Sequence, residues 1–371
     1  MHHAPRTTHR APCTVRVAGT DRARLIITPA STAPARDPTS SAASAPVKKI
    51  NVFAKVAAKN VVVRSLMSMF DVYRNEIHSY AAVDWPIRVP HVHCAKWSKS
   101  RFCLILEDLH DRGAAFPNVW EQHVDPPLAK QVLSTLAVLH ASNWGDAGIP
   151  RGCWGATNRP YKARSMGMFT LWRVTSLYPN LISQEIAQAF KVALWRWNDL
   201  QAYWETTAPR CMVHGDTHMG NFFIESDGTI GTFDLQVKSE EHPLRDVAYF
   251  LACSYPEEDL PKHEEMLIKH YIAELHRTAA AGTGTGAGAA KVLADEIPSF
   301  EEAWFQYRLH TWYATKSKEN PFPAENLRED TGGLLRLPLR RWGRSNGNPS
   351  ATSRCGGLRR SLSADATRAL S

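Results

Sequence analysis

The sequence has no run of about 18 apolar residues, so we expect no transmembrane helix. Its 7 cysteines are odd in number and widely spaced, and no CxxC pair occurs, which favours reduced thiols over a disulfide framework. The N-terminus lacks the apolar core of a secretory signal, although its Arg-, Ser- and Ala-rich, acid-poor composition is also typical of transit peptides. We therefore expect a cytoplasmic protein.

Acidic residues are scarce at both ends of the chain. Residues 1–50 carry a net charge of +6 and residues 331–371 a net charge of +7, so the formal charge of +8 leaves −5 for the middle. A basic protein often binds nucleic acid, but here the basic residues lie in two tails and not on the body. Nucleic acid is therefore not an expected partner, and nothing in the sequence indicates an oligomeric state.

The 371 residues, 44% of them hydrophobic, suffice for one large or two ordinary domains. We expect a disordered N-terminus over 1–12, a small β-rich unit with one helix over 13–108, a helical unit over 109–330 and a disordered basic tail over 331–371. Residues 31–47 read as a flexible loop. Strands are predicted at 23–28, 50–56 and 101–109, and helices at 74–83, 129–144, 183–204, 245–254, 262–278 and 300–316.

The most informative stretch is CMVHGDTHMGNFFIES, residues 211–226. Two short strands flank the Ser-Asp-Gly turn at 226–228, which is a strong hairpin signal. Asp216 and Asn221 lie five residues apart, and Asp234 ends the returning strand. The hairpin should therefore bring Asp234 back beside Asn221, placing three oxygen-bearing side chains together within a loop over 211–236.

Phosphoryl transfer from ATP needs such oxygens, together with a cation for the phosphates and an acid that holds it. Lys55 lies between apolar residues in a predicted strand, and Glu76 follows 21 residues later in the predicted helix. A lone Lys in a strand is usually an exposed edge residue, so the pair Lys55–Glu76 is the stronger signal. ILEDL, residues 105–109, follows at the place of a segment linking two lobes.

With HGDTHMGNFF, GTFDLQ and RDVAYFLA, the chain resembles the aminoglycoside phosphotransferase and choline kinase superfamily. ILEDL, LAVLHASNW and FAKV…YRNEIHSY resemble its ecdysteroid-kinase-like branch, also called CHK-kinase-like, and the resemblance covers roughly residues 15–320. It implies an α+β, protein-kinase-like bilobal fold, with a small β-rich N-lobe and a larger helical C-lobe. It also implies an ATP- and Mg²⁺-dependent kinase that acts on a hydroxylated small molecule.

The resemblance assigns roles by position. Asp216 matches the catalytic base, and Asn221 and Asp234 match the Mg²⁺ ligands. The nucleotide contacts would come from Lys55 with its partner Glu76, from Gly19 and Thr20 in a phosphate-covering hairpin that also holds Arg22, and from the backbone of Glu107 and Leu109 at the adenine. Asp246 and His214 match residues with a structural role.

Other interpretations remain open. His214, Asp216 and His218 could be metal ligands, since Gly-Asp-Thr-His also matches dinuclear metallophosphoesterases, although the further elements of those enzymes are absent. The covering loop has few glycines, so the chain could also be a catalytically weak or inactive pseudokinase-type scaffold. Six Trp between 144 and 204 either pack the helical lobe or line an acceptor pocket, with Trp144 and Trp172 the candidates for the pocket.

Overall fold

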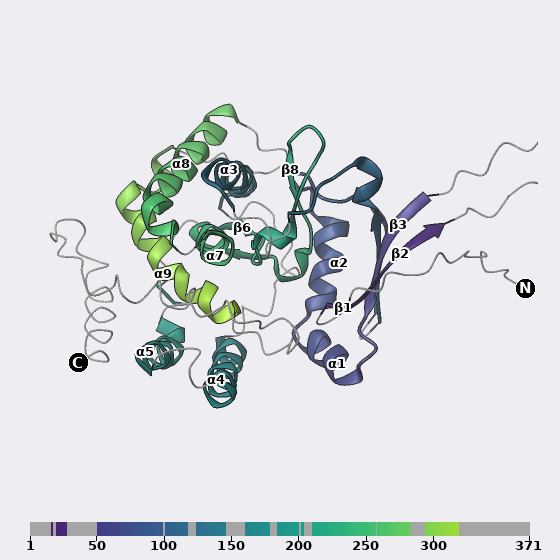
Figure 1. Cartoon of the computed structure of the whole chain (residues 1–371), viewed down its shortest axis with the longest axis horizontal. Helices are drawn as coiled ribbons and strands as arrows, with labels where there is room; N and C mark the ends of the chain where they lie inside the picture. Colours follow the sequence, from purple (N-terminus) through teal and green to yellow (C-terminus); the bar gives the residue numbers. More distant parts are fainter. Residues whose placement is uncertain are drawn as a thin grey trace, which may run out of the picture.

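The structure is a computed structural model with two lobes, a β-sheet lobe and a helical lobe (Figure 1). It describes residues 16–17, 20–27, 50–98, 101–117, 124–145, 160–178, 184–199, 202–203, 210–256, 258–282 and 294–318. The predicted loop at 31–47 and the predicted tails at 1–12 and 331–371 lie outside these ranges. Over the described ranges, no helix combines the length and hydropathy that a membrane crossing requires. The predicted α+β, protein-kinase-like bilobal fold is confirmed.

The N-lobe is built on a five-stranded antiparallel sheet with the order β1-β2-β3-β5-β4. Its strands are β1 (Arg16–Val17), β2 (Thr20–Ile27), β3 (Ile50–Ala57), β4 (Val92–Ser98) and β5 (Arg101–Glu107). In β5 the burial alternates, with Phe102, Leu104 and Leu106 buried, which gives the sheet one face toward the N-lobe core. The three predicted strands of this lobe are therefore present, and β4 is additional.

Two helices follow β3, where the sequence predicted one. The predicted helix is α2 (Val72–Ala82), and the additional one is α1 (Val61–Met69). The run Val61-Val62-Val63 has high strand propensity, but the side chain of Asn60 caps the N–H groups of Val62 and Val63 and starts a helix instead. No residue of α1 is buried, so this helix adds no fully buried side chain to the N-lobe core.

Helix α2 packs on the sheet (Figure 1), and its aromatic side chains close the N-lobe core. Tyr73 stacks on Phe102 of β5 with ring centroids 5.0 Å apart. Leu235, which belongs to the loop after the C-lobe hairpin, is fully buried in the same cluster. The N-lobe core therefore includes a residue next to Asp234, and this contact ties the hairpin to the sheet lobe.

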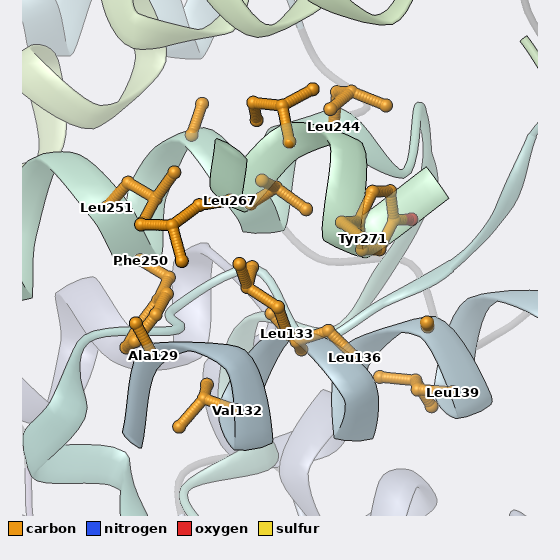
Figure 2. Close-up of a cluster of buried hydrophobic side chains, with 14 of the residues drawn as sticks. Ala129, Val132, Leu133, Leu136, Leu139, Leu244, Phe250, Leu251, Leu267 and Tyr271 are labelled. Atoms are coloured by element: carbon orange, nitrogen blue, oxygen red, sulfur yellow. The ribbon is translucent and has the colours of Figure 1, made fainter. Parts of the chain in front are cut away.

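The C-lobe core lies between α3 (Pro126–Ser142), α7 (Leu244–Ser254), α8 (Leu260–Ala281) and α9 (Phe300–Lys318). Figure 2 shows Leu133 and Leu136 of α3 opposite Leu267 and Tyr271 of α8. Asp125 caps α3 by accepting from the N–H of Leu128, and two prolines open the helix, where no N–H partner is needed. All four of these helices were predicted to within a few residues.

Two short ladders sit between the core and the N-lobe. Strand β6 (Cys211–Val213) pairs with β9 (Ser239–Glu241), and β7 (Phe222–Ile224) pairs with β8 (Ile230–Thr232) as the predicted hairpin. Both run antiparallel, so the chain leaves the core at β6 and returns to it at β9. The loop that carries the polar residues is held at both ends.

The remaining helices, α4 (Pro160–Leu177) and α5 (Gln184–Trp195), lie below α9 in the view of Figure 1. The helix predicted over 183–204 is α5, followed after a turn at Arg196 by further helical residues at 197–199 and 202–203, and α4 was not predicted. The tryptophans differ in their burial. Trp144 is buried in the C-lobe core, whereas Trp172 and Trp195 are about 60% exposed. Trp144 thus has a packing role and is not a pocket residue.

Candidate active site

Lys55 and Glu76 form a buried ion pair, as the sequence predicted. Lys55 Nζ lies 2.6 Å from Glu76 Oε1, and the two side chains are 3% and 1% exposed. Strand β3 projects Lys55 toward α2, and α2 presents Glu76 one turn after Tyr73, which anchors the helix to the sheet. Two residues 21 apart in sequence therefore meet because strand and helix pack face to face.

Asp234 lies beside this pair and is held by two cations. Lys55 Nζ is 2.8 Å from its Oδ1, and Arg22 Nη2 is 2.7 Å from its Oδ2. The backbone of Asp234 has φ 64° and ψ 55°, the left-handed conformation that costs energy for a residue with a Cβ. The N–H of Asp234 donates to the hydroxyl of Tyr80 on α2, a contact that helps to hold this conformation.

The pKa values of the two buried acids in this cluster are shifted in opposite directions. Burial alone would raise the pKa of Asp234, but the charges of Lys55 and Arg22 outweigh burial and hold the pKa far below its ordinary value. For Glu76 burial is the stronger influence and raises the pKa, although Lys55 opposes it. Asp234 is therefore the firmly ionised member, which suits a ligand for a divalent cation.

Asp216 and Asn221 meet in the loop between β6 and β7. Asn221 Nδ2 donates to Asp216 Oδ2 at 3.1 Å and to the backbone oxygen of Asp216 at 2.8 Å. This leaves the side-chain oxygen of Asn221 as its group for a metal. The side chain of Asp216 is 22% exposed, and over the described residues its Oδ1 accepts no hydrogen bond. Asp216 can therefore receive a proton from a bound molecule.

The hairpin holds Asn221 against Asp234. The backbone oxygen of Asn221 accepts from the N–H of Phe233 at 3.0 Å and from the hydroxyl of Thr232 at 2.8 Å. Since Asp234 follows directly in the chain, the two predicted metal ligands are neighbours in space. Their proximity was predicted from the Ser-Asp-Gly turn, and the pairing of β7 with β8 confirms it.

Asp246 of α7 braces the loop from below. Its carboxylate accepts from the N–H groups of His214 at 2.7 Å and of Gly215 at 2.9 Å, and it is fully buried. Burial raises its pKa, but the hydrogen bond from His140 and these donors lower it below the ordinary value. Gly215 has φ 86°, and a Cβ there would lie 2.5 Å from the Val237 oxygen, so only glycine fits. The predicted structural role of Asp246 is supported by these contacts.

His214 is not positioned as a metal ligand. Its Nδ1 lies 3.2 Å from the N–H of Asp216, and its Nε2 lies 3.0 Å from the backbone oxygen of Phe233. An imidazole protonated at Nε2 satisfies both contacts, so neither nitrogen is left for a metal. His218 is partly exposed, with its Nε2 3.8 Å from Asp216 Oδ2. These contacts argue against the imidazole-based metal site that the sequence left open.

Glu107 holds the lobes together through its side chain. Its carboxylate binds Arg88 at 2.8 Å and Arg112 at 3.5 Å, and both arginines also contact Glu225 on the hairpin. The carboxylate of Glu107 also accepts from the N–H of His91. The N–H of Glu107 donates to the backbone oxygen of His91, so what Glu107 can offer a nucleotide is its backbone oxygen. Leu109 begins a short 3-10 helix, where the first N–H has no partner within the helix.

Of the two residues predicted in the covering hairpin, Gly19 lies outside the described residues and Thr20 is the first residue of β2. The role of Arg22 was missed, although the residue was noted near the turn. Its signal was the alternation along β2, which puts Arg22 and Arg24 on one face. The sequence could not show that this face meets Asp234, because the two residues are 212 positions apart.

The comparison with known proteins now bears on this geometry. Residues 100–282 match the phosphotransferase enzyme family, APH. The matched segment carries the whole loop with Asp216, Asn221 and Asp234. The match supports a phosphotransferase that acts on hydroxyl groups, and it supports the aminoglycoside phosphotransferase and choline kinase superfamily. Among curated proteins, no sequence matches the chain significantly.

Solved structures with a similar arrangement include three phosphotransferases. Choline kinase LicA from Streptococcus pneumoniae has a TM-score of 0.42 at 13% identity, covering 78% of this chain and 85% of that chain. Aminoglycoside-3′-phosphotransferase of type VIII has 0.39 at 16%, covering 81% and 94%. Macrolide 2′-phosphotransferase MphH from Brachybacterium faecium has 0.39 at 12%, covering 91% and 95%. Likenesses this distant assign no substrate to this chain.

Proposed function

We propose that this phosphotransferase is an ATP- and Mg²⁺-dependent small-molecule kinase that transfers the γ-phosphoryl group to a hydroxyl of a metabolite. The observation that carries the proposal is the cluster of Lys55, Glu76 and Asp234, with contacts of 2.6 and 2.8 Å, next to the pair Asp216–Asn221. A cation for phosphates, oxygens for a metal and a carboxylate for a proton are the parts that phosphoryl transfer requires.

The residues fit a magnesium ion. Asp234 is ionised and already attracts two cations, and Asn221 directs its donor nitrogen at Asp216, so its oxygen is left for a metal. Hard oxygen ligands of this kind are those Mg²⁺ prefers. When bound with the nucleotide, the ion would supply charge neutralisation on the phosphates. Asn221 and Asp234 would hold it.

In the proposed reaction, Asp216 orients the acceptor hydroxyl and takes its proton. The hydroxyl oxygen forms a bond to the γ-phosphorus, and the bond from that phosphorus to the ADP oxygen breaks. Lys55 neutralises charge on the phosphates, while Glu76 fixes the position of its ammonium group. The catalysis rests on positioning and on charge stabilisation, because little covalent help is needed.

The ecdysteroid-kinase-like branch is supported by the motifs around Lys55, Glu76 and Glu107, each of which lies at the nucleotide side of the site. A cytoplasmic location is supported by the four cysteines in the described ranges, Cys94, Cys103, Cys211 and Cys253, which are all thiols.

The test combines nucleotide binding with turnover. Mg-ATP at millimolar concentration should raise the melting temperature, and a screen of hydroxylated metabolites for ATP consumption should identify the acceptor. Asp216→Asn should then lower kcat about 10²–10⁴-fold while Mg-ATP still binds, as expected for loss of a general base. Asp227→Asn, in the exposed hairpin turn, is the matched control and should keep full activity. Wild-type turnover in Asp216→Asn would contradict the proposed base. Absence of any Mg-ATP shift would favour the scaffold alternative.

A further inference from the structure

Arg22 occupies a position on the sheet that mirrors Lys55. The two residues are directly opposite each other in the register of β2 and β3. Cross-strand partners project from the same face of a sheet, so both cationic side chains leave it toward the C-lobe. Both reach the same carboxylate, that of Asp234, at 2.7 and 2.8 Å.

The cationic and anionic side chains of the cluster are equal in number only when Asp234 is included. Lys55 and Arg22 face the carboxylates of Glu76 and Asp234, two positive groups against two negative ones. If Asp234 turns to a divalent ion, Arg22 loses its partner. The side chain of Arg22 is only 17% exposed, and a charge so poorly hydrated needs another anion nearby.

Arg22 also has donors that the cluster does not use. Its only side-chain hydrogen bond over the described ranges is from Nη2 to Asp234 Oδ2. Its Nε is buried and has no hydrogen-bond partner within that part of the chain. A guanidinium carries five N–H donors in a fork that matches phosphate oxygens. The unused donors therefore suit an oxyanion with several oxygens.

If the role of Arg22 were purely structural, Arg22 would act as a clasp, which here means an ion pair that holds the two lobes together. Two residues along the same strand, Arg24 Nε lies 3.3 Å from Asp108 in the segment that links the lobes, and the side chain of Arg24 is half exposed. Arg22 differs from it in two respects: its side chain is only 17% exposed, and its partner is the carboxylate proposed to bind the metal. A clasp on Asp234 would compete with metal binding, whereas a clasp on Asp108 would not.

We propose that Arg22 is a second phosphate-binding cation of the nucleotide site, which exchanges Asp234 for the phosphates when a metal-nucleotide complex binds. This inference rests on the proposed kinase function. It also explains how a covering hairpin with few glycines could bind phosphates. The guanidinium of Arg22 on β2 would supply hydrogen-bond donors from a side chain, in place of donors from the loop backbone.

The experiment compares ligands with and without phosphates. Adenosine, AMP, Mg-ADP and Mg-ATP are titrated by calorimetry into wild type, Arg22→Gln, Arg22→Lys and the matched control Arg24→Gln. Circular dichroism and thermal melting confirm that each variant is folded. In Arg22→Gln, Mg-ATP should bind about tenfold or more weakly, the loss expected for a charge-assisted hydrogen bond to phosphate. Adenosine should change less than about twofold. Arg22→Lys should recover part of the loss, and Arg24→Gln should leave the ratio of the Mg-ATP and adenosine affinities unchanged.

The possible results distinguish a phosphate-binding role of Arg22 from a purely structural role, and both from failure of the proposed kinase function. Equal weakening of adenosine and Mg-ATP in Arg22→Gln would identify a clasp and overturn the inference, as would unchanged affinity for both. If Arg22→Gln does not fold, the same comparison rests on Arg22→Lys, where an unchanged ratio overturns it. A folded wild type that binds no Mg-nucleotide overturns the proposed kinase function itself, and the inference with it.

Discussion

Replacing Lys55 by methionine should destabilise the fold as well as remove a phosphate-binding charge. Methionine preserves the length and packing of the side chain, but Glu76 loses the ammonium group 2.6 Å from its Oε1. The other oxygen of Glu76, Oε2, is buried without a hydrogen-bond partner among the described residues. Breaking a buried pair in this way costs about 3–5 kcal/mol, because one charge remains uncompensated. Urea unfolding followed by tryptophan fluorescence measures this loss.

The loss should depend on pH in a defined direction. Burial already raises the pKa of Glu76, and without Lys55 the strongest opposing influence is gone. A buried carboxyl with a raised pKa is tolerated when protonated, whereas the unfolded chain ionises from about pH 4.3 upward. The stability of Lys55→Met should therefore fall as pH rises above that value, by up to about 1.4 kcal/mol per pH unit until the folded pKa is passed. The variant should be closer to wild type at pH 5 than at pH 8.

A second substitution decides whether the reasoning is right. Lys55→Met/Glu76→Gln removes the stranded charge and keeps the shape of the side chain, so it should recover about 2 kcal/mol or more of the lost stability at pH 8. Its stability deficit should also lose the pH dependence of the single variant. A double variant no more stable than Lys55→Met, or a deficit equal at pH 5 and pH 8, would refute the stranded-charge explanation.

Two further predictions concern the support of the loop. Asp246→Asn should cost about 1–3 kcal/mol and most of the turnover, because one of its two acceptors for the N–H groups of His214 and Gly215 becomes a donor. Urea unfolding and kcat check this, and an active variant of wild-type stability would contradict it. His242 is buried and neutral: burial, assisted by His140, lowers its pKa to about 3. The unfolded imidazole binds a proton below about pH 6.5, whereas the buried one stays neutral. His242 should therefore lower the free energy of unfolding by up to about 2 kcal/mol as the pH falls from 6.5 to 5. His242→Asn should flatten that slope in urea titrations, and an unchanged slope would exclude this source.

The polar loop was predictable because its signals are local. Asp216, Asn221 and the hairpin turn lie within a few residues of one another, and the turn chemistry fixes the return of Asp234. The pairing of Lys55 with Glu76 was also predicted, from a spacing that a strand and the next helix share. Neither prediction needed to know how the two lobes meet.

The elements and contacts that the sequence did not predict depend on packing that residue spacing does not encode. Helix α1 has no buried residue, and it begins with three valines whose strand propensity hides the helix. Strand β4 has no clean alternation of burial and exists because β5 pairs with it. The contact of Arg22 with Asp234 requires the two lobes to be docked, and the sequence of either lobe alone gives no sign of it.

The sequence separations within the site have a consequence for how the chain folds. The contact of Asp216 with Asn221 spans 5 residues, whereas those of Lys55 and Arg22 with Asp234 span 179 and 212. Closing long loops delays contacts, so the oxygen-bearing half of the site can form inside the C-lobe before the cationic half arrives. Until then Asp234 is an acid without counterions, and it becomes fully stabilised only when the two lobes dock. Assembly of the ion cluster should therefore be a late step in folding.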